Sequence, residues 1–503
     1  MKKLSLLFIG VLSMSNVMAQ NVSDAVRYSQ DEIQGTARFR GMSGAFGALG
    51  GDMSAVSINP AGSAIFNNSY ASFTLSSLNT KNETSYFNGR NSSTNSDFDL
   101  NQAGAAFVFK NTDKSSIWNK FVLSIAYDKS SNYDDKWTSN GTSTTSIDSY
   151  FLNQAQGLRL DEISAFPGES FSSAYSGIGS AYGYRNQQAF LGYESYILEP
   201  MDDTDGNTVY TSNVAPGDFD QRYRYAATGY NGKVSFNIGT QIKEKISLGL
   251  NLNSHFISYE KISFLNEQNS NPGSLVNEIG FENTLYTTGN GFSFQLGTIA
   301  KVTKDLRVGL AYNSPTWYTI NDETTQYLAT LRGSTNIPQV VNPNTINVFS
   351  DYKLKTPSKI TGSLAYIFGD RGLLSFDYSR KDFSKTEYKP TTDPDFAYQN
   401  NLMSNNLTAA STYKIGGEYR YKQLSFRGGY RLEESPYKNT STYGDLNGYS
   451  LGLGYNFGNT KLDLAFDQSN RDIDYQLYSN GLTNAATIES KFTNVTVSLA
   501  FNL

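Results

Sequence analysis

The chain has 503 residues, carries 41 lysines and arginines against 46 aspartates and glutamates, and contains no cysteine. Without cysteine it can form no disulfide, no thiolate metal site and no cysteine nucleophile. The mild acidic excess excludes the strongly basic surface that binds nucleic acid, so we expect no nucleic acid partner.

The first nineteen residues predict a secretory signal peptide. Lys2 and Lys3 give a basic start, an apolar core follows, and Ala19 ends a small-residue cleavage site. Polar Ser13 interrupts the apolar core well before the roughly 20 residues that a membrane-spanning helix needs. We therefore expect residues 1–19 to be removed and the mature chain, starting at Gln20, to be exported.

A glycine-spaced segment, 41–51, comes next and is unlike the rest of the chain. A phosphate-binding loop is one interpretation, because glycine backbones can approach an anion closely. The segment contains no G-x-G-x-x-G, follows no apolar strand and precedes no Lys-Ser or Lys-Thr pair, which argues against nucleotide binding. Small residues at this spacing also let short helices or turns pack tightly inside a narrow cylinder. The sequence therefore predicts that residues 20–67 form a plug.

The remainder of the chain alternates apolar residues with small or polar ones, most clearly in 246–253, 449–457 and 495–503. The second face carries Gly, Ala, Ser and Asn rather than the Lys and Glu of a sheet that faces water. A barrel that is apolar outside, toward lipid, and polar inside has this pattern. Short and long connections alternate between the segments. We predict an all-β fold, a 14-stranded antiparallel transmembrane β-barrel over residues 68–503, with both termini on the periplasmic side.

Charged residues also occur on the polar faces, where they would point into the lumen. If Lys422-Gln423 forms a two-residue turn, the register brings Glu418 opposite Arg427. Charge on the lipid face would cost roughly 2 to 4 kcal/mol near the membrane midplane. The sequence thus predicts a Glu418–Arg427 pair inside the barrel.

The connection 134–220 is too long for a plain loop and has helical periodicity. We predict a helical extracellular loop that forms a lid. An external loop has no core of its own, so its apolar helix faces either pack on each other or form a groove for a ligand. Both alternatives are open at this point. The candidate ligand-capture residues are Phe151, Leu158, Phe190, Tyr193 and Ile197.

Two features invite a catalytic or metal-binding interpretation. His255 is the only histidine, and its parity matches that of the lumen-facing asparagines on its strand, which favours a hydrogen-bonded lumen residue over the base of a hydrolase. The acidic run 202–207 lacks the glutamate that a calcium loop needs at its twelfth position, which counted from Asp203 is Val214. We expect no metal, no cofactor and no enzymatic activity.

The order of motifs before the first strand is similar to a known family. Gly41-Met-Ser-Gly-Ala, then Asp52, then Asn59-Pro-Ala-Gly62 resembles the N-terminal hatch of the FadL-type outer-membrane transporters, known for long-chain fatty acid uptake. The resemblance extends to the strand count and the C-terminal strand, and so covers nearly all of the mature chain. The hatch residues that it selects are Gly41, Gly44, Phe46, Gly47, Asp52, Asn59, Pro60, Ala61, Gly62 and Phe66.

The resemblance implies a monomeric, multi-pass barrel in the outer membrane of a Gram-negative bacterium. A hydrophobic small molecule would be caught by extracellular loops, pass the hatch and leave sideways into the membrane lipid, with no energy source. The third strand, 121–129, contains neither Gly nor Pro, so a kink expected there by resemblance has no cause in the sequence. Whether Asn59-Pro-Ala-Gly62 moves during transport or only seals the barrel stays open.

We therefore expect a passive outer-membrane transporter for hydrophobic molecules such as long-chain fatty acids. The alternative is a FadL-like barrel that acts as a scaffold for protein secretion or surface attachment. A non-selective porin is a third possibility, and the predicted plug argues against it.

Overall fold

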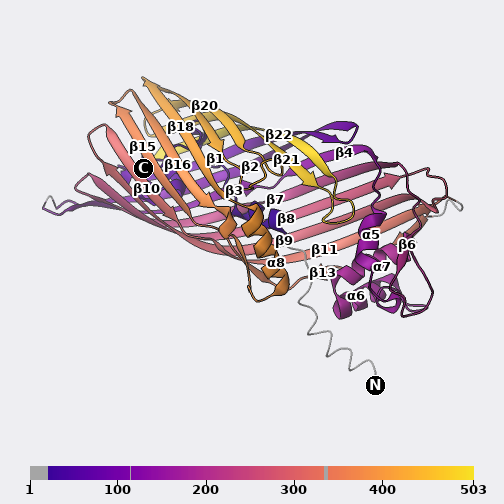
Figure 1. The fold of residues 1–503 in the computed structure, drawn as a ribbon. Helices are drawn as coiled ribbons and strands as arrows, with labels where there is room; N and C mark the ends of the chain where they lie inside the picture. Colours follow the sequence, from indigo (N-terminus) through magenta and orange to yellow (C-terminus); the bar gives the residue numbers. More distant parts are fainter. Residues whose placement is uncertain (1–20, 114, 334–337) are drawn as a thin grey trace.

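The computed structural model describes residues 21–113, 115–333 and 338–503. The predicted signal peptide, residues 1–19, lies outside the described residues. One antiparallel sheet closes on itself, because β1 (Tyr70–Tyr86) pairs with β2 (Gly89–Lys110) on one side and with β22 (Ala485–Asn502) on the other. The result is a closed barrel of fourteen wall strands, as the sequence predicts (Figure 1).

Several wall strands are interrupted and continue after a short break. The wall strands between β2 and β22 are β3 (Trp118–Asn132) with β4 (Asp135–Ser143), β7 (Phe219–Ile242), β8 (Ile246–Gln268), β9 (Val276–Lys301), β10 (Leu306–Asn313) with β11 (Trp317–Arg332), β14 (Tyr352–Lys355) with β15 (Lys359–Phe368), β16 (Gly372–Asp382), β18 (Ala409–Tyr421), β19 (Leu424–Glu433), β20 (Leu446–Asn456) and β21 (Thr460–Gln476). The short strands β12 (Pro338–Val341), β13 (Asn347–Val348) and β17 (Glu387–Lys389) extend the same sheet.

An apolar belt surrounds the half of the barrel that carries the short turns. On β22, Val495, Val497 and Leu499 face outward and are exposed, whereas the alternating Thr496 and Ser498 are buried inside. The same alternation on the other strands places large apolar side chains outside and small polar ones in the lumen. A closed sheet with this belt satisfies its backbone groups internally and meets lipid only with apolar atoms.

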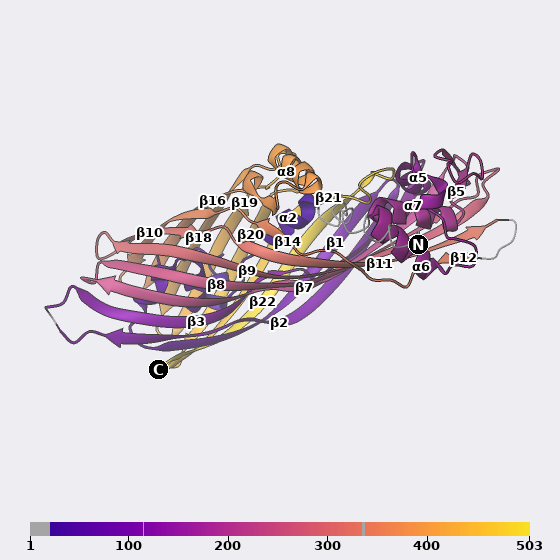
Figure 2. The ribbon, with the colours of Figure 1, turned by 90° about the horizontal axis from the view of Figure 1, so that it is seen from below.

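The wall rises far above this belt on one side. β7 has 24 residues and β9 has 26, whereas roughly 9–11 tilted residues span a bilayer. The extensions of β7, β8, β9 and β11 carry the lid, which contains α5 (Asp148–Ala155), α6 (Phe171–Tyr182), α7 (Tyr184–Glu194), the short helix η2 (Leu160–Glu162) and a small sheet of β5 (Leu198–Pro200) and β6 (Tyr210–Ser212). Figure 2 shows the lid at one end of the molecule and the C-terminus at the other.

Three elements of the part above the apolar belt were missed by the sequence prediction. The β1–β2 hairpin is taller than expected, β4 continues the wall into the predicted loop, and α8 (Pro394–Asn406) covers the rim above β14 and β17. Above the belt the outer face meets water instead of lipid and carries polar residues such as Lys81 and Glu83, while the buried inner face is also largely polar, so the apolar–polar alternation that marks a wall strand is lost there. The start of α8 does have a local signal, because Asp393 caps the helix and Pro394 occupies its first turn.

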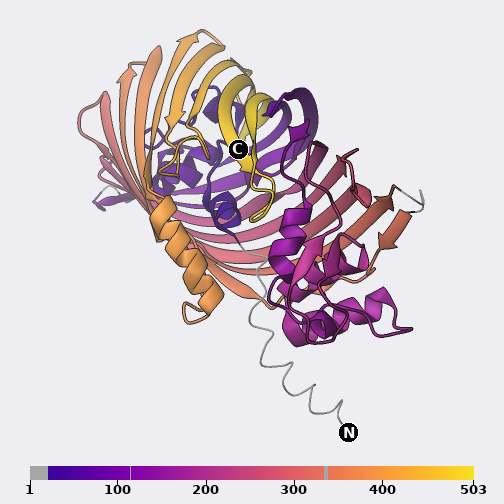
Figure 3. The ribbon, with the colours of Figure 1, turned by 45° about the vertical axis from the view of Figure 1, so that its right-hand side comes forward.

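The N-terminal segment fills the lumen. It contains α2 (Val22–Ser29), α3 (Ala37–Arg40), α4 (Met53–Ile58) and the 3-10 helix η1 (Pro60–Ile65), and a further 3-10 helix, η3 (Phe383–Lys385), lies at the rim. In Figure 3 these N-terminal elements, in indigo, lie inside the ring of strands. No helix in the described part of the chain is long and apolar enough to cross a membrane.

Glycines of the wall make room for the plug backbone. A Cβ atom on Gly249 would lie 2.2 Å from the carbonyl carbon of Pro60, and one on Gly309 would lie 2.3 Å from the carbonyl oxygen of Gly47. At Gly416 a Cβ would lie 2.5 Å from a plug carbonyl oxygen. These wall positions therefore admit only glycine while the plug is docked.

We expect Gly249→Ala to destabilise the docked plug by about 1–3 kcal/mol, because its methyl group overlaps the plug backbone. The matched control is Gly362→Ala on β15, which faces outward and has no neighbouring atom within 4 Å of its Cβ. Urea unfolding in detergent micelles measures the difference. Equal stability of the two variants would contradict the tight fit between wall and plug.

Candidate functional site

The plug is built from short helices held by side-chain caps. Asp52 caps α4 through the Ser54 amide (2.9 Å) and also accepts a hydrogen bond from the Thr36 hydroxyl (2.8 Å), while Thr36 caps α3. Asp52 is buried, so its carboxylate joins two segments that would otherwise separate. This role gives a physical reason for an acidic residue between two glycine-rich stretches.

The Asn59-Pro-Ala-Gly62 motif ties the plug to one side of the wall. The Asn59 side chain accepts from the Ala61 amide (3.1 Å) and donates to the carbonyl oxygens of Gly47 (2.7 Å) and Thr298 (3.0 Å). Pro60 starts η1, and its carbonyl oxygen accepts from Asn237 on β7 (3.0 Å). The motif is thus the junction between the plug and strands β7 to β9.

Gly62 closes the plug on itself. Its carbonyl oxygen accepts from the Gly51 amide (3.1 Å), and a Cβ atom on Gly62 would lie 3.3 Å from the Gly50 Cα. The plug then ends at Phe66, whose ring stacks on Tyr70 of β1 with 4.8 Å between ring centroids.

The glycine-spaced segment does hold an anion, but that anion belongs to the wall. The amides of Phe46 and Gly47 donate to the Asp377 carboxylate at 3.0 and 2.9 Å. Gly44 has a φ of +72°, which turns the chain before these amides. Gly41 packs on β20, where its Cβ would lie 3.0 Å from the Gly452 Cα.

Glu418 and Arg427 face each other across β18 and β19, with Arg427 Nε 2.7 Å from a Glu418 oxygen. Both side chains are buried in the lumen. Arg38 of the plug donates to the same carboxylate at 2.8 Å, and Arg427 also donates to Asp463 at 2.6 Å. The wall pair is therefore part of a network that includes the plug.

A second ion pair binds the plug to β21. Arg40 holds Asp467 with two hydrogen bonds of 2.9 and 3.0 Å, and both side chains are buried. Sequence reasoning missed Arg38 and Arg40. Two arginines within an otherwise small and apolar segment were the available signal.

Two cavities lie on either side of the plug segment 30–34, with volumes of about 290 and 130 Å³. Both are rich in basic side chains. Asp31 accepts from Lys359 (2.9 Å) and Lys381 (3.3 Å). Lys233 and Lys414 line the smaller cavity, and the ammonium group of neither makes a hydrogen bond or an ion pair with a residue in the described ranges, although they lie opposite Asp128 and Asp377 on neighbouring strands. These two ammonium groups are available to an anion.

His255 lines the smaller cavity, and its Nε2 lies 2.8 Å from the Ser293 hydroxyl. Its Nδ1 is buried and has no hydrogen-bond partner among the described residues. A serine hydrolase needs an acidic or polar group at that atom to orient the imidazole. The histidine and serine therefore form a lumen hydrogen bond without the third member of a triad.

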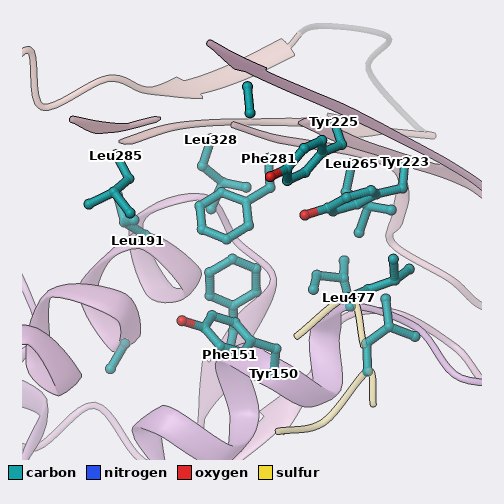
Figure 4. Close-up of a cluster of buried hydrophobic side chains, with 14 of the residues drawn as sticks. Tyr150, Phe151, Leu191, Tyr223, Tyr225, Leu265, Phe281, Leu285, Leu328 and Leu477 are labelled. Carbon is teal, nitrogen blue, oxygen red and sulfur yellow. The ribbon is translucent and has the colours of Figure 1, made fainter. Parts of the chain in front are cut away.

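The lid residues proposed for ligand capture are packed against the wall. Phe151 and Phe190 are fully buried, and Phe151 contacts Phe281 of β9 with 5.2 Å between ring centroids. Figure 4 shows Phe151 and Tyr150 beside Phe281, in the cluster that joins the lid to β8, β9 and β11. Ile197 belongs to the same cluster, and Leu158 and Tyr193 pack at its edge. These side chains form the core of the lid.

Residues 202–206 of the acidic run are exposed and form a turn, which ends at the buried Asn207. The Asp202 carboxylate accepts a hydrogen bond of 3.0 Å from the Thr204 amide. Local hydrogen bonding therefore accounts for this carboxylate.

Glu267 anchors the lid at the C-terminal end of β8, beyond the apolar belt. Its carboxyl group accepts from the Ile147 amide (2.9 Å), from Gln221 (2.7 Å) and from the Ser146 hydroxyl. Burial raises the pKa of Glu267 to about 7. Asp148, at the start of α5, adds a smaller repulsion in the same direction.

The backbone ladder of the wall is interrupted beside the larger cavity. Pairing between β2 and β3 ends at Gln102 and Asp128, and β3 has a bulge between Lys129 and Ser131. Above this point the Lys129 ammonium bridges to Asp99 instead. The irregularity begins where the stretch 121–129 ends, and a run of polar residues rather than Gly or Pro accompanies it.

On β2, Asn101 is the extra residue of a bulge opposite β1. Its buried side-chain oxygen accepts a hydrogen bond from the Gly35 amide. Its side-chain nitrogen donates to the Ser76 hydroxyl (3.0 Å) and to the side-chain oxygen of Gln34. The interruption in the wall is therefore linked directly to the plug segment that separates the cavities.

Comparison with solved structures defines the class of the fold. The structure matches a Pseudomonas aeruginosa FadL homologue with a TM-score of 0.54 and 12% identity, over 94% of this chain and 99% of that chain. It matches the Pseudomonas putida toluene transporter TodX with a TM-score of 0.53 and 13% identity, over 94% and 99%. For the CymD monoaromatic hydrocarbon channel the values are 0.51 and 13%, over 93% and 97%. The protein has the fold of FadL-type barrels.

A match between the sequence and a family model identifies the family. A family described as BamG matches residues 204–503, and the chain belongs to this family. A comparison with curated proteins finds no match.

We expect Arg40→Met to weaken the docked plug by about 3–5 kcal/mol, because it leaves the Asp467 carboxylate buried and unpaired. The double variant R40M/D467N removes both charges and recovers most of the loss. Hydrogen exchange of residues 36–50 measures the plug's opening free energy. The matched control is Arg159→Met in the exposed pair with Asp161, which should change stability by less than about 1 kcal/mol. An equal effect of R40M and R159M would refute the role of the buried pair.

The raised pKa of Glu267 makes lid docking depend on pH. The docked state binds the proton more tightly than the open state, in which a glutamate has a pKa of about 4.3. The docking free energy is therefore greatest below about pH 4.3 and declines as the pH rises toward 7. We expect hydrogen exchange in residues 146–158, corrected for its intrinsic rate, to quicken over that range.

The variant Glu267→Gln should abolish this pH dependence and keep the lid docked, because an amide accepts and donates hydrogen bonds without a charge. The half-buried Glu169→Gln, at the N-terminal side of α6, serves as the control and should retain the dependence. Unchanged pH dependence in E267Q would assign the effect to another group.

Proposed function

We propose that the protein is a passive transporter in the outer membrane for hydrophobic molecules with an anionic head group, such as long-chain fatty acids. The pair of free lysines, Lys233 and Lys414, in a lumen cavity is the observation that carries this proposal. A carboxylate is a suitable partner for ammonium groups shielded from bulk water. The toluene transporter and the hydrocarbon channel of the same fold support the hydrophobic part of the ligand.

In the proposed path a ligand passes the lid and its head group reaches the lysine-lined cavities. There it competes with Asp31, which already occupies Lys359 and Lys381. Displacement of Asp31 frees the plug segment 30–34, which separates the two cavities. The head group then moves between them without crossing the apolar belt unpaired.

We infer an exit beside the interruption between β2 and β3. The larger cavity reaches this part of the wall, where residues 131–135 line it. The ladder there is replaced by side-chain contacts such as that of Lys129 with Asp99. Side chains can separate at lower cost than a hydrogen-bonded ladder, and an apolar tail gains about 0.8 kcal/mol per methylene on entering lipid. Transport in this form needs no energy source, and a single chain is sufficient for it.

A sealed scaffold is the second candidate, and the fastening of the plug favours it. Ion pairs, caps and amide contacts bind the plug to wall strands on all sides, as Arg38 with β18, Arg40 with β21 and Asn59 with β9 illustrate. A barrel closed in this way could hold the lid and the tall wall outside the cell as a platform for other proteins. In that case the plug would not move.

We expect the double variant K233Q/K414Q to lower oleate uptake by about tenfold in a strain that lacks the wild-type gene, since charge-assisted hydrogen bonds contribute roughly 1.5–3 kcal/mol. Uptake of an uncharged hydrocarbon should stay unchanged. Lys353→Gln, at an exposed position on β14, is the control. If the deletion strain takes up oleate normally but loses proteins from its surface, the transporter proposal fails and the scaffold is supported.

A further inference from the structure

The apolar belt is interrupted by a groove on the outer face of β16, β18 and β19. Gly417 and Gly428 are cross-strand partners whose positions face outward, between the pairs Ile415–Tyr430 and Tyr419–Phe426. Because glycine has no side chain, the ring of large residues is absent at this place. The groove has a volume of about 760 Å³, and Phe368 and Leu374 complete its lining.

The floor of the groove is rigid. The neighbouring glycines Gly416 and Gly429 face the lumen, where Cβ atoms on them would each lie 2.5 Å from the backbone of Met42. The plug therefore supports the wall directly behind the groove. A groove with such a floor is preformed, so binding costs little free energy for rearranging the protein.

Positive charge lies at the end of the groove that carries the short turns. Arg371, in the turn between β15 and β16, lines the groove, and its carbonyl oxygen accepts from the amide of Arg420 (2.7 Å), near the end of β18 and just before the turn to β19. Lys422 is in that second turn. Neither Arg371 nor Lys422 forms an ion pair with a residue in the described ranges, although Asp370 lies beside Arg371 in sequence.

The whole rim on this side is basic, although the chain is acidic overall. Basic residues outnumber acidic ones in and beside the short turns. The basic residues are Lys110, Lys243, Lys245, Lys301, Lys304, Arg371, Arg420 and Lys422, and the acidic ones are Asp113, Glu244, Asp305 and Asp370. An anionic membrane surface attracts such a rim.

We propose that this groove binds an anionic glycerophospholipid of the membrane leaflet on the short-turn side. One acyl chain lies over Gly428, beside the Leu374 side chain that packs on Gly417, and the phosphate is held by Arg371 and Lys422. Apolar surfaces have no hydrophobic drive to associate within a bilayer, so a bound lipid is selected by shape and head-group charge. The groove supplies the shape and the two free cations supply the charge. This site lies outside the lumen and does not depend on transport.

The test is native mass spectrometry of the full-length mature protein, released from mixed micelles that contain phosphatidylglycerol and phosphatidylcholine. Gly428→Leu fills the groove from its floor, because the nearest atom to a Cβ there is 3.9 Å away. Gly362→Leu is the matched control, an outward glycine of the same belt with no atom within 4 Å of its Cβ. Arg371→Gln removes a cation and leaves the groove open.

We expect the wild type and G362L to retain one phosphatidylglycerol in preference to phosphatidylcholine, and G428L to retain neither above background. R371Q should lower the preference for phosphatidylglycerol by about fivefold, the effect of one cation near an anionic surface. A change in the temperature at which the barrel unfolds in SDS gels would identify a misfolded variant, and for G428L the milder Gly428→Val then replaces it.

Equal lipid retention by G428L and the wild type would overturn the proposal. So would a preference for phosphatidylglycerol that R371Q and Lys422→Gln leave intact. Loss of a co-purifying membrane protein from G428L, with lipid retention unchanged, would assign the groove to a protein partner instead.

Discussion

Carboxylates of the wall hold the plug in the barrel, and the rest of the structure depends on them. Glu418 and Asp467 bind Arg38 and Arg40, and Asp377 accepts the amides of the glycine-spaced segment. Charges buried in a narrow lumen are stable only when they are paired and hydrogen-bonded. Glu418 also has Arg427 of the wall as a partner, but without the plug Asp467 would lose Arg40, and without the wall Arg38 and Arg40 would lose their carboxylates. The two therefore form one folding unit, although one is a transmembrane sheet and the other a set of short helices.

The wall strands were predictable because each membrane-spanning strand must alternate apolar side chains toward lipid with polar side chains toward the lumen. The prediction failed at the tall β1–β2 hairpin and at β4, where the outer face of the sheet meets water instead of lipid and is no longer apolar. Register was predictable only through local turn chemistry. The two-residue turn at Lys422 predicted that Glu418 lies opposite Arg427, and the structure has this register.

Contacts between plug and wall could not be read from the sequence. Arg38 and Glu418 are 380 positions apart, and no local pattern links them. The glycine spacing in the plug did indicate close packing, but the close approach also requires glycines on the wall, such as Gly249 and Gly309. These resemble any other small residue on a lumen face until the plug backbone is placed beside them. The lid residues were correctly recognised as apolar and periodic, yet periodicity does not distinguish a ligand groove from a core.

The closure of β1 on β22 has a consequence for the order of assembly. The plug precedes the first strand, but Asp377, Glu418 and Asp467, which fasten it, lie on late strands. A barrel that closed first would have to admit a folded plug whose backbone touches wall glycines such as Gly249 and Gly309 on the inside of the lumen. The plug must therefore lie against the curling sheet before the last strand meets the first. The N-terminal segment then serves as a template, around which the second half of the wall folds.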